Sequence, residues 1–118
     1  MIGKMKRVIL FVKDMKTVTG FYRDKLGLKP IISTEWPPSE WIEFDAGGVN
    51  VALHSAPKPG GGARCRTKIV FYGKDVAKAR AKLVKKGVKM GELHRWDDLH
   101  LCDGSDPEGN RFQISNRA

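Results

Sequence analysis

Apolar and polar residues alternate along several short segments of the chain, which is the pattern of half-buried β-strands. The segment NRFQIS (110–115) places Phe112 and Ile114 on one face and Arg111, Gln113 and Ser115 on the other. One face must be buried in a core, and the other must meet water or a ligand. Further strands of this kind are predicted within RVILFVKD (7–14), WIEFDAGG (41–48), VNVALHS (49–55), KIVFY (68–72) and DLHLCD (98–103).

A longer pattern occurs twice. Residues 7–29 and 68–89 share the order apolar strand, Lys-Asp, amphipathic helix, glycine and short second strand. Asp14 and Asp75 stand where a helix N-cap is needed, and Gly27 and Gly87 stand where each helix must end in a left-handed conformation. The spacing therefore predicts helices near residues 15–26 and 76–86.

The repeat predicts an α+β fold made of two βαβββ modules. Module one spans residues 1–55, the Pro/Gly-rich segment APKPGGGAR (56–64) is a linker, and module two spans residues 65–118. Neither half can bury its sheet alone. We expect the two modules to form one domain, with a curved mixed sheet around a cavity and the helices on the outside.

The alternation also assigns the faces of the strands. Val8, Leu10 and Val12 are expected to pack against a helix, which leaves the opposite parity for the cavity. The residues predicted to line that cavity are Arg7, Phe11, Trp41, Glu43, His54, Lys68, Tyr72, His100 and Gln113. By the same parity Ile9, Ala52, Val70, Cys102 and Ser115 share this face.

Composition is that of a water-soluble globular protein, with 41% hydrophobic and 30% charged residues in 118. No apolar run reaches the roughly 20 residues that a membrane-spanning helix needs. The first apolar run ends at Lys13-Asp14 without a small-residue cleavage site, so it is interpreted as a strand and not as a signal peptide. The two cysteines, Cys65 and Cys102, favour a reducing compartment, with a single disulfide as the alternative. The expected location is the cytoplasm.

The net charge of +9 raises the question of nucleic-acid binding. Many of the cations follow a helical spacing, at Lys74, Lys78, Lys82, Lys85 and Lys89. No aromatic residue is interleaved with them to stack on bases, so a solvated helix face is the favoured interpretation. We expect no nucleic-acid and no membrane partner, and the charge favours a neutral or anionic ligand.

The duplicated module, Lys13-Asp14 followed by FYRDKLGLK, and the closing DPEGNRFQIS resemble the vicinal oxygen chelate superfamily. That superfamily contains glyoxalase I, extradiol dioxygenases and bleomycin-resistance proteins. The resemblance covers essentially the whole chain and implies the fold and a homodimer. It does not imply one activity, because the superfamily hosts many reactions.

In metal-dependent members, the resemblance implies four ligands at positions that correspond here to Arg7, Ala52, Lys68 and Gln113. Arginine and lysine repel a divalent ion, and alanine offers no donor atom. We therefore expect no metal and no cofactor at these positions. A different metal site built from His54, Glu43, His100 and Cys102 stays open, although none of them has the spacing of a metal-binding motif and His94 is expected in a loop.

Two hypotheses for function follow. The first is a small-molecule-binding protein in which Arg7 and Lys68 hold an anionic or carbonyl group. Phe11, Trp41 and Tyr72 would form apolar walls, and Glu43, His54, His100 and Gln113 would orient the ligand. The alternative is a glyoxalase-type lyase, isomerase or dioxygenase, with a shifted metal site or with His54 or His100 as a metal-free acid or base. Cys102 is expected to be structural and not a nucleophile.

Overall fold

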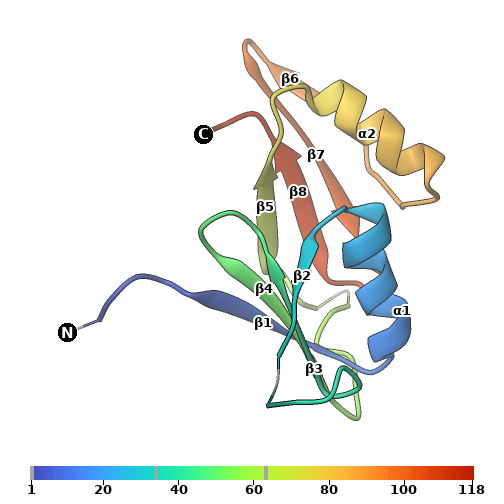
Figure 1. Cartoon of the computed structure of the whole chain (residues 1–118). Coiled ribbons are helices and arrows are strands. Elements are labelled where there is room, and N and C mark those ends of the chain that lie inside the picture. Colours follow the sequence, from blue (N-terminus) through green and yellow to red (C-terminus); the bar gives the residue numbers. More distant parts are fainter. Residues whose placement is uncertain (1, 34, 63) are drawn as a thin grey trace. The chain divides into compact units, whose positions relative to one another are not determined.

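The structure, a computed structural model of the whole chain, describes residues 2–33, 35–62 and 64–118 (Figure 1). It divides into two compact units, Met1–Gly61 and Gly62–Ala118. Each unit contains one mixed four-stranded sheet and one helical segment. The predicted α+β class and the duplicated βαβββ order are confirmed.

In the first unit the sheet order is β1-β4-β3-β2. The β1 and β4 strands run parallel, and the other neighbours are antiparallel. The elements are β1 (Arg7–Val12), α1 (Met15–Gly20), the π-helical turn η1 (Phe21–Lys25), β2 (Lys29–Ile31), β3 (Trp41–Asp45) and β4 (Asn50–Ser55).

The second unit repeats this arrangement with the order β5-β8-β7-β6. Here β5 and β8 run parallel, and β6-β7 and β7-β8 are antiparallel. The elements are β5 (Lys68–Tyr72), α2 (Val76–Lys85), β6 (His94–Trp96), β7 (Leu99–Ser105) and β8 (Arg111–Ser115).

Both predicted N-caps are confirmed. The Asp14 carboxylate accepts a hydrogen bond from the Thr17 amide at 3.1 Å, and the Asp75 carboxylate accepts one from the Lys78 amide at 3.0 Å. These bonds satisfy amide groups of the first helical turn that have no partner within the helix. Gly27 and Gly87 have φ values of 74° and 83°, the left-handed conformation in which each helix was predicted to end.

The first helix differs from the prediction in its last turn. The predicted single helix near residues 15–26 is an α-helix that becomes a π-helix at Phe21, where the Leu26 amide donates to the Phe21 carbonyl at 3.0 Å. This wider turn buries Phe21 and Tyr22 together, and Tyr22 packs against Phe44 of the sheet with ring centroids 6.1 Å apart. The second helix is amphipathic, as predicted, and the five lysines along it and at its ends are exposed.

Each unit has its own core beneath its helix. Val12, Val18, Phe44 and Leu53 are fully buried in the first unit. Val76, Cys102 and Phe112 are buried to the same extent in the second unit. No helix among the described residues is long and apolar enough to cross a membrane.

Two sequence predictions in the second unit are wrong. The short strand expected directly after Gly87 is reduced to a single bridge between Met90 and Gly104. The edge strand β6 forms later in the chain and includes His94, which was expected in a loop. The faces of β7 are also inverted, because Cys102 lies opposite Ile114 and Asp103 lies opposite Gln113. Cys102 and His100 therefore share the core face, and a slip of one residue in a strand accounts for the error.

Gly104 fixes the register of β7 physically. A Cβ atom at this position would lie 2.5 Å from Cζ of Phe112 and 2.6 Å from Sδ of Met90. Only glycine leaves room for the Phe112 ring and the Met90 side chain as they pack here.

We expect Gly104→Ala to lower the free energy of unfolding by about 1–3 kcal/mol, because the added methyl group overfills a packed core. Chemical denaturation would measure this loss. Gly91→Ala is the matched control, since its Cβ atom would meet its nearest atom, the Asp103 carbonyl oxygen, at an ordinary 3.5 Å. Equal stabilities of the two variants would contradict the β7 register.

Candidate functional site

The outer face of the first sheet collects the cavity residues that were predicted in module one. The register places Arg7 opposite Asn50, and Phe11 and Trp41 both opposite His54. Glu43 lies opposite Ala52 on the same face. Residues directly opposite one another point to the same side of a sheet, so Arg7, Phe11, Trp41, Glu43 and His54 do share one face.

A charged cluster lies on this face. Arg7 Nε donates to Glu43 Oε2 at 3.1 Å, and Asn50 Nδ2 donates to the same oxygen at 2.7 Å. The Glu43 side chain is 13% exposed. Burial of this carboxylate would raise its pKa, but the hydrogen bonds from Asn50 and Arg7 outweigh that effect, and the pKa is lowered.

The second unit contains a matching cluster. Lys68 Nζ lies 3.2 and 3.1 Å from the two carboxylate oxygens of Asp103, and Gln113 Nε2 donates to Asp103 Oδ1 at 3.0 Å. Lys68, Gln113 and Asp103 come from β5, β8 and β7, which correspond to β1, β4 and β3 of the first unit. Both units thus have a cation from the first strand, an amide and a carboxylate in hydrogen-bond contact.

These clusters do not fit a divalent metal ion. Each carboxylate is already neutralised by a cation of the protein, and each amide uses its N–H₂ group as a donor to that carboxylate. Ala52 is buried and supplies no ligand atom. No group of three or more His, Cys, Asp or Glu side chains that could hold a metal occurs in the described ranges 2–33, 35–62 and 64–118.

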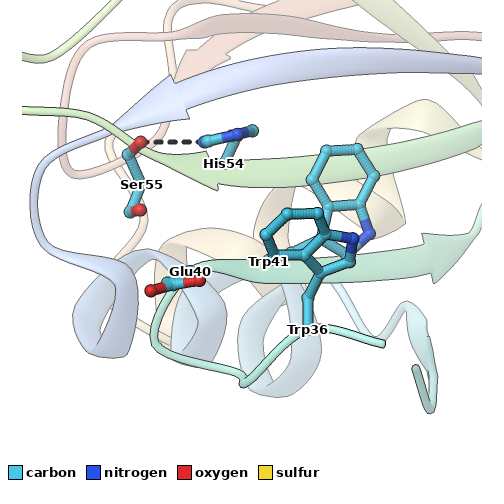
Figure 2. A pocket seen from close by; sticks show the side chains of 5 residues that line it. All are labelled: Trp36, Glu40, Trp41, His54 and Ser55. Carbon is cyan, nitrogen blue, oxygen red and sulfur yellow. Dashed lines mark hydrogen bonds between the residues drawn. The ribbon is translucent and has the colours of Figure 1, made fainter. Parts of the chain in front are cut away.

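A pocket of about 190 Å³ lies in the first unit where β3 begins and β4 ends. Figure 2 shows its lining: the two indole rings of Trp36 and Trp41, the Glu40 carboxylate, and His54 and Ser55 from the end of β4. Its position is fixed by backbone hydrogen bonds. Glu40 and Trp41 both donate to the Pro37 carbonyl, at 2.9 and 3.1 Å, and Ser55 donates to the Glu40 carbonyl at 3.0 Å.

The tautomer of His54 follows from its contact. Nδ1 lies 2.8 Å from the carbonyl oxygen of Ser55, drawn as the dashed line in Figure 2. A carbonyl oxygen only accepts, so Nδ1 carries the proton and Nε2 of the neutral ring is an acceptor. The ring packs edge-on to Trp41, with centroids 5.7 Å apart, and lies 5.5 Å from Phe11.

The remaining predicted residues fall into two groups. Lys68, Tyr72 and Gln113 lie on the outer face of the second sheet, as their register partners Arg111, Ser115 and Asp103 show. His100 lies on the core side, where its backbone amide donates to Oδ1 of Asn116 at 2.9 Å. The face prediction for His100 is therefore wrong.

Cys102 also belongs to the core side. It is completely buried, and this burial raises the pKa of its thiol. A raised pKa disfavours the thiolate that a nucleophile or a metal ligand requires. The structural role predicted for Cys102 agrees with this environment, and both cysteines are free thiols.

Sequence reasoning missed Asn50, Asp103, Trp36 and Glu40. Asp103 could have been found by aligning β7 on β3, because a carboxylate then stands opposite Gln113 just as Glu43 stands opposite Ala52. Trp36 and Glu40 precede a strand in a Pro-rich loop. No periodicity extends through that loop, so no sequence signal indicated that they line a pocket with His54.

A sequence model of the Glyoxalase/Bleomycin resistance protein/Dioxygenase superfamily matches residues 4–114. The chain belongs to this superfamily. No curated protein matches the chain in a sequence search.

Solved structures of this superfamily share the fold. The chain resembles lactoylglutathione lyase from Agrobacterium tumefaciens, with a TM-score of 0.75, 21% identity, and coverage of 97% of this chain and 93% of that one. A superfamily member from Sphaerobacter thermophilus gives a TM-score of 0.77 at 21% identity, with 97% of each chain covered. TioX from a Micromonospora species gives 0.79 at 15% identity, with 98% of this chain and all of that chain (100%) covered. At these identities the likeness concerns the fold alone.

The lowered pKa of Glu43 predicts a pH dependence of stability. A carboxylate with a lowered pKa in the folded state stabilises the fold above its unfolded pKa, and this contribution is lost as the pH falls through the folded value. We expect Glu43→Gln to cost about 0.5–1 kcal/mol at neutral pH. The difference from the unmodified protein should shrink on acidification to about pH 3.

Denaturation at several pH values would measure this difference. Glu92→Gln removes an exposed carboxylate in the second unit and is the control. It should follow the unmodified protein at every pH. A Glu43→Gln difference that stays constant with pH would show that the Arg7–Glu43 pair has no role in acid stability.

Proposed function

We propose that this protein binds a small organic molecule without a metal ion. The observation that carries the proposal is the pair of cation–carboxylate–amide clusters, Arg7–Glu43–Asn50 and Lys68–Asp103–Gln113. Arg7, Lys68 and Gln113 of these clusters occupy positions where the family resemblance implies metal ligands. A divalent ion at either cluster would have to displace a cation from a carboxylate. The described residues contain no group of three or more His, Cys, Asp or Glu side chains that could hold such an ion.

The pocket of the first unit supports small-molecule binding. Its walls are aromatic, with a few polar groups that can orient a ligand, which is the usual composition of such sites. Phe11 continues the aromatic surface beyond His54 and is 48% exposed. The superfamily as a whole typically binds small molecules, and this agrees with the proposal.

The ion pairs reduce the support for an anionic ligand. Lys68 already donates to both oxygens of Asp103, and Arg7 already donates to Glu43. An anion would therefore have to compete with a carboxylate of the protein for each of these cations. The overall positive charge is a weaker guide to the ligand than the groups that line the pocket.

A second candidate is a metal-free enzyme with His54 as the acid or base. The hydrogen bond from Nδ1 to the Ser55 carbonyl favours it, because this contact leaves Nε2 as the acceptor. Lyase, isomerase and dioxygenase activities of the glyoxalase type belong to this candidate. Binding without catalysis is the simpler proposal, because no nucleophile or second acid lies in hydrogen-bond contact with His54 among the described residues.

We further propose that the two modules act as one domain in the cytoplasm. The family match across residues 4–114 supports the single domain. The free thiols of Cys65 and Cys102 support a reducing compartment.

We expect purified protein, prepared without a metal-binding tag, to contain no stoichiometric divalent metal. We also expect no glyoxalase or extradiol dioxygenase activity after addition of zinc, nickel, manganese or iron. Elemental analysis and activity assays would measure both. Tightly bound metal that is lost in Gln113→Ala would overturn the metal-free assignment, and activity that needs no metal but is lost in His54→Gln would favour the enzyme.

We also expect a homodimer. Ile9, Phe11, Val70 and Tyr72 expose apolar side chains on the outer faces of the two sheets, and Tyr72 is 62% exposed. Exposed apolar patches and open sheet edges favour association. Sedimentation equilibrium at micromolar concentration should give twice the monomer mass of 13.2 kDa. Tyr72→Lys should weaken the association, and a monomeric unmodified protein would contradict it.

A further inference from the structure

The pocket beside β3 and β4 differs in charge from the rest of the chain. The chain has 22 Lys and Arg residues against 13 Asp and Glu. Among the described residues, the pocket is lined by one carboxylate, that of Glu40, and by no lysine or arginine. The indole rings of Trp36 and Trp41 belong to the same lining (Figure 2).

The Glu40 side chain lines this pocket and is exposed. In the described ranges it has no hydrogen-bond or ion-pair partner, whereas Glu43 accepts from both Arg7 and Asn50. The Glu40 backbone is nevertheless held at both its N–H and C=O groups, through Pro37 and Ser55. The carboxylate is thus a negative charge with no cation of the chain against it among the described residues, on a backbone that is held in place.

Trp36 is the second unusual feature. It is 56% exposed, although a large aromatic side chain gains most by burial. Its neighbour in the pocket, Trp41, is half-buried on the sheet and held edge-on to His54. Two indole rings and a carboxylate around one small space form the arrangement that proteins use to recognise ammonium groups.

We propose that this pocket binds the ammonium group of a small organic cation, through the indole rings of Trp36 and Trp41 and the carboxylate of Glu40. The proposal rests on the proposed function, whose ligand class it specifies. An alkylated ammonium ion is attracted by the negative face of an indole ring, and the nearby carboxylate adds a Coulomb attraction. Charges elsewhere on the protein act less, because salt screens them over about 8 Å.

The size of the pocket limits what it encloses. Its volume of about 190 Å³ lies below the roughly 300–1,000 Å³ of sites that enclose a drug-sized ligand. The pocket therefore takes the ammonium end of the ligand. The rest of the molecule extends past His54 onto the outer face of the sheet, where Phe11 offers an exposed ring 5.5 Å from the His54 ring.

Titration with three compounds that share a phenyl ring would test the proposal: benzyltrimethylammonium as the cation, benzyl alcohol as the neutral compound and phenylacetate as the anion. The chain has three tryptophans, so proton–nitrogen correlation spectra contain three indole N–H signals, which single Trp→Phe variants assign. We expect the cation to shift the Trp36 and Trp41 signals in a saturable way. Trp96, which stacks on His94 in the second unit, should not respond.

Substitutions would separate charge from aromatic contact. We expect Glu40→Gln to weaken binding of the cation about threefold to fivefold and to leave benzyl alcohol unaffected. Trp36→Leu should weaken cation binding to a similar or greater extent. Glu92→Gln removes the same charge from an exposed position in the second unit and should change nothing.

The outcomes distinguish this inference from the proposed function. Saturable binding of phenylacetate or benzyl alcohol at Trp36 and Trp41, without binding of the cation, would overturn the ligand class and leave metal-free binding standing. No shift with any of the three compounds would overturn the pocket as a binding site. Cation binding that is unchanged in Glu40→Gln would overturn the role of the carboxylate. Stoichiometric metal in the purified protein would overturn the proposed function instead.

Discussion

Each unit must bury one face of a four-stranded sheet beneath a single helical segment, and this requirement determines which side chains are left for function. The core sides of β1 and β4 supply Val12 and Leu53, and those of β7 and β8 supply Cys102 and Phe112. Because side chains alternate along a strand, the residues next to each core position are directed to the outer face. The charged clusters, the exposed rings of Phe11 and Tyr72, and the positions of Trp41 and His54 in the first-unit pocket follow from this alternation, whereas Trp36 and Glu40 come from the loop before β3. The helical segment of each unit covers one face of its sheet, and the side chains available for binding lie on the other face.

The positive charge of a cation on a partly buried sheet face has to be neutralised, and both units neutralise it with a carboxylate in the same way. In each, a carboxylate of the third strand in the sheet order accepts from a first-strand cation and from an amide of the strand between them. The two arrangements use different residues, Arg7 with Glu43 and Lys68 with Asp103. The spatial pattern is repeated although the residue types are not, which indicates that neutralisation is the shared requirement. A metal ion would supply the same positive charge beside the carboxylate, so a cation of the chain and a metal are alternatives at such a place.

The fold could be predicted from the sequence because its signals are local. Asp14 and Asp75 cap helices within three residues of themselves, and Gly27 and Gly87 end them. The site could be predicted only in part. The faces of β1, β4, β5 and β8 follow from clear alternation, but Leu99, Leu101 and Cys102 place apolar residues on both parities of β7, so its hydrophobic pattern does not identify the core face. The deciding constraint there is the contact of Gly104 with Phe112 and Met90, which depends on partners distant in sequence. Trp36 and Glu40 line a pocket with His54 for the same kind of reason, since the backbone bond between Ser55 and Glu40 holds the loop beside the end of β4.

Net charge and local charge lead to different expectations for the ligand, and the geometry decides between them. The excess of +9 suggests attraction of anions, but much of it lies on lysines along and beside α2 that are exposed to solvent. Such charges raise the encounter rate with anions and contribute little to the affinity of a site that they do not line. Arg7 and Lys68, which lie on the outer faces of the two sheets, are held by carboxylates. Glu40 is in the reverse situation, since it is a carboxylate beside two indole rings and has no cation of the chain against it among the described residues. This local arrangement, and not the net charge, is the basis of the proposal that the pocket takes the ammonium group of a ligand.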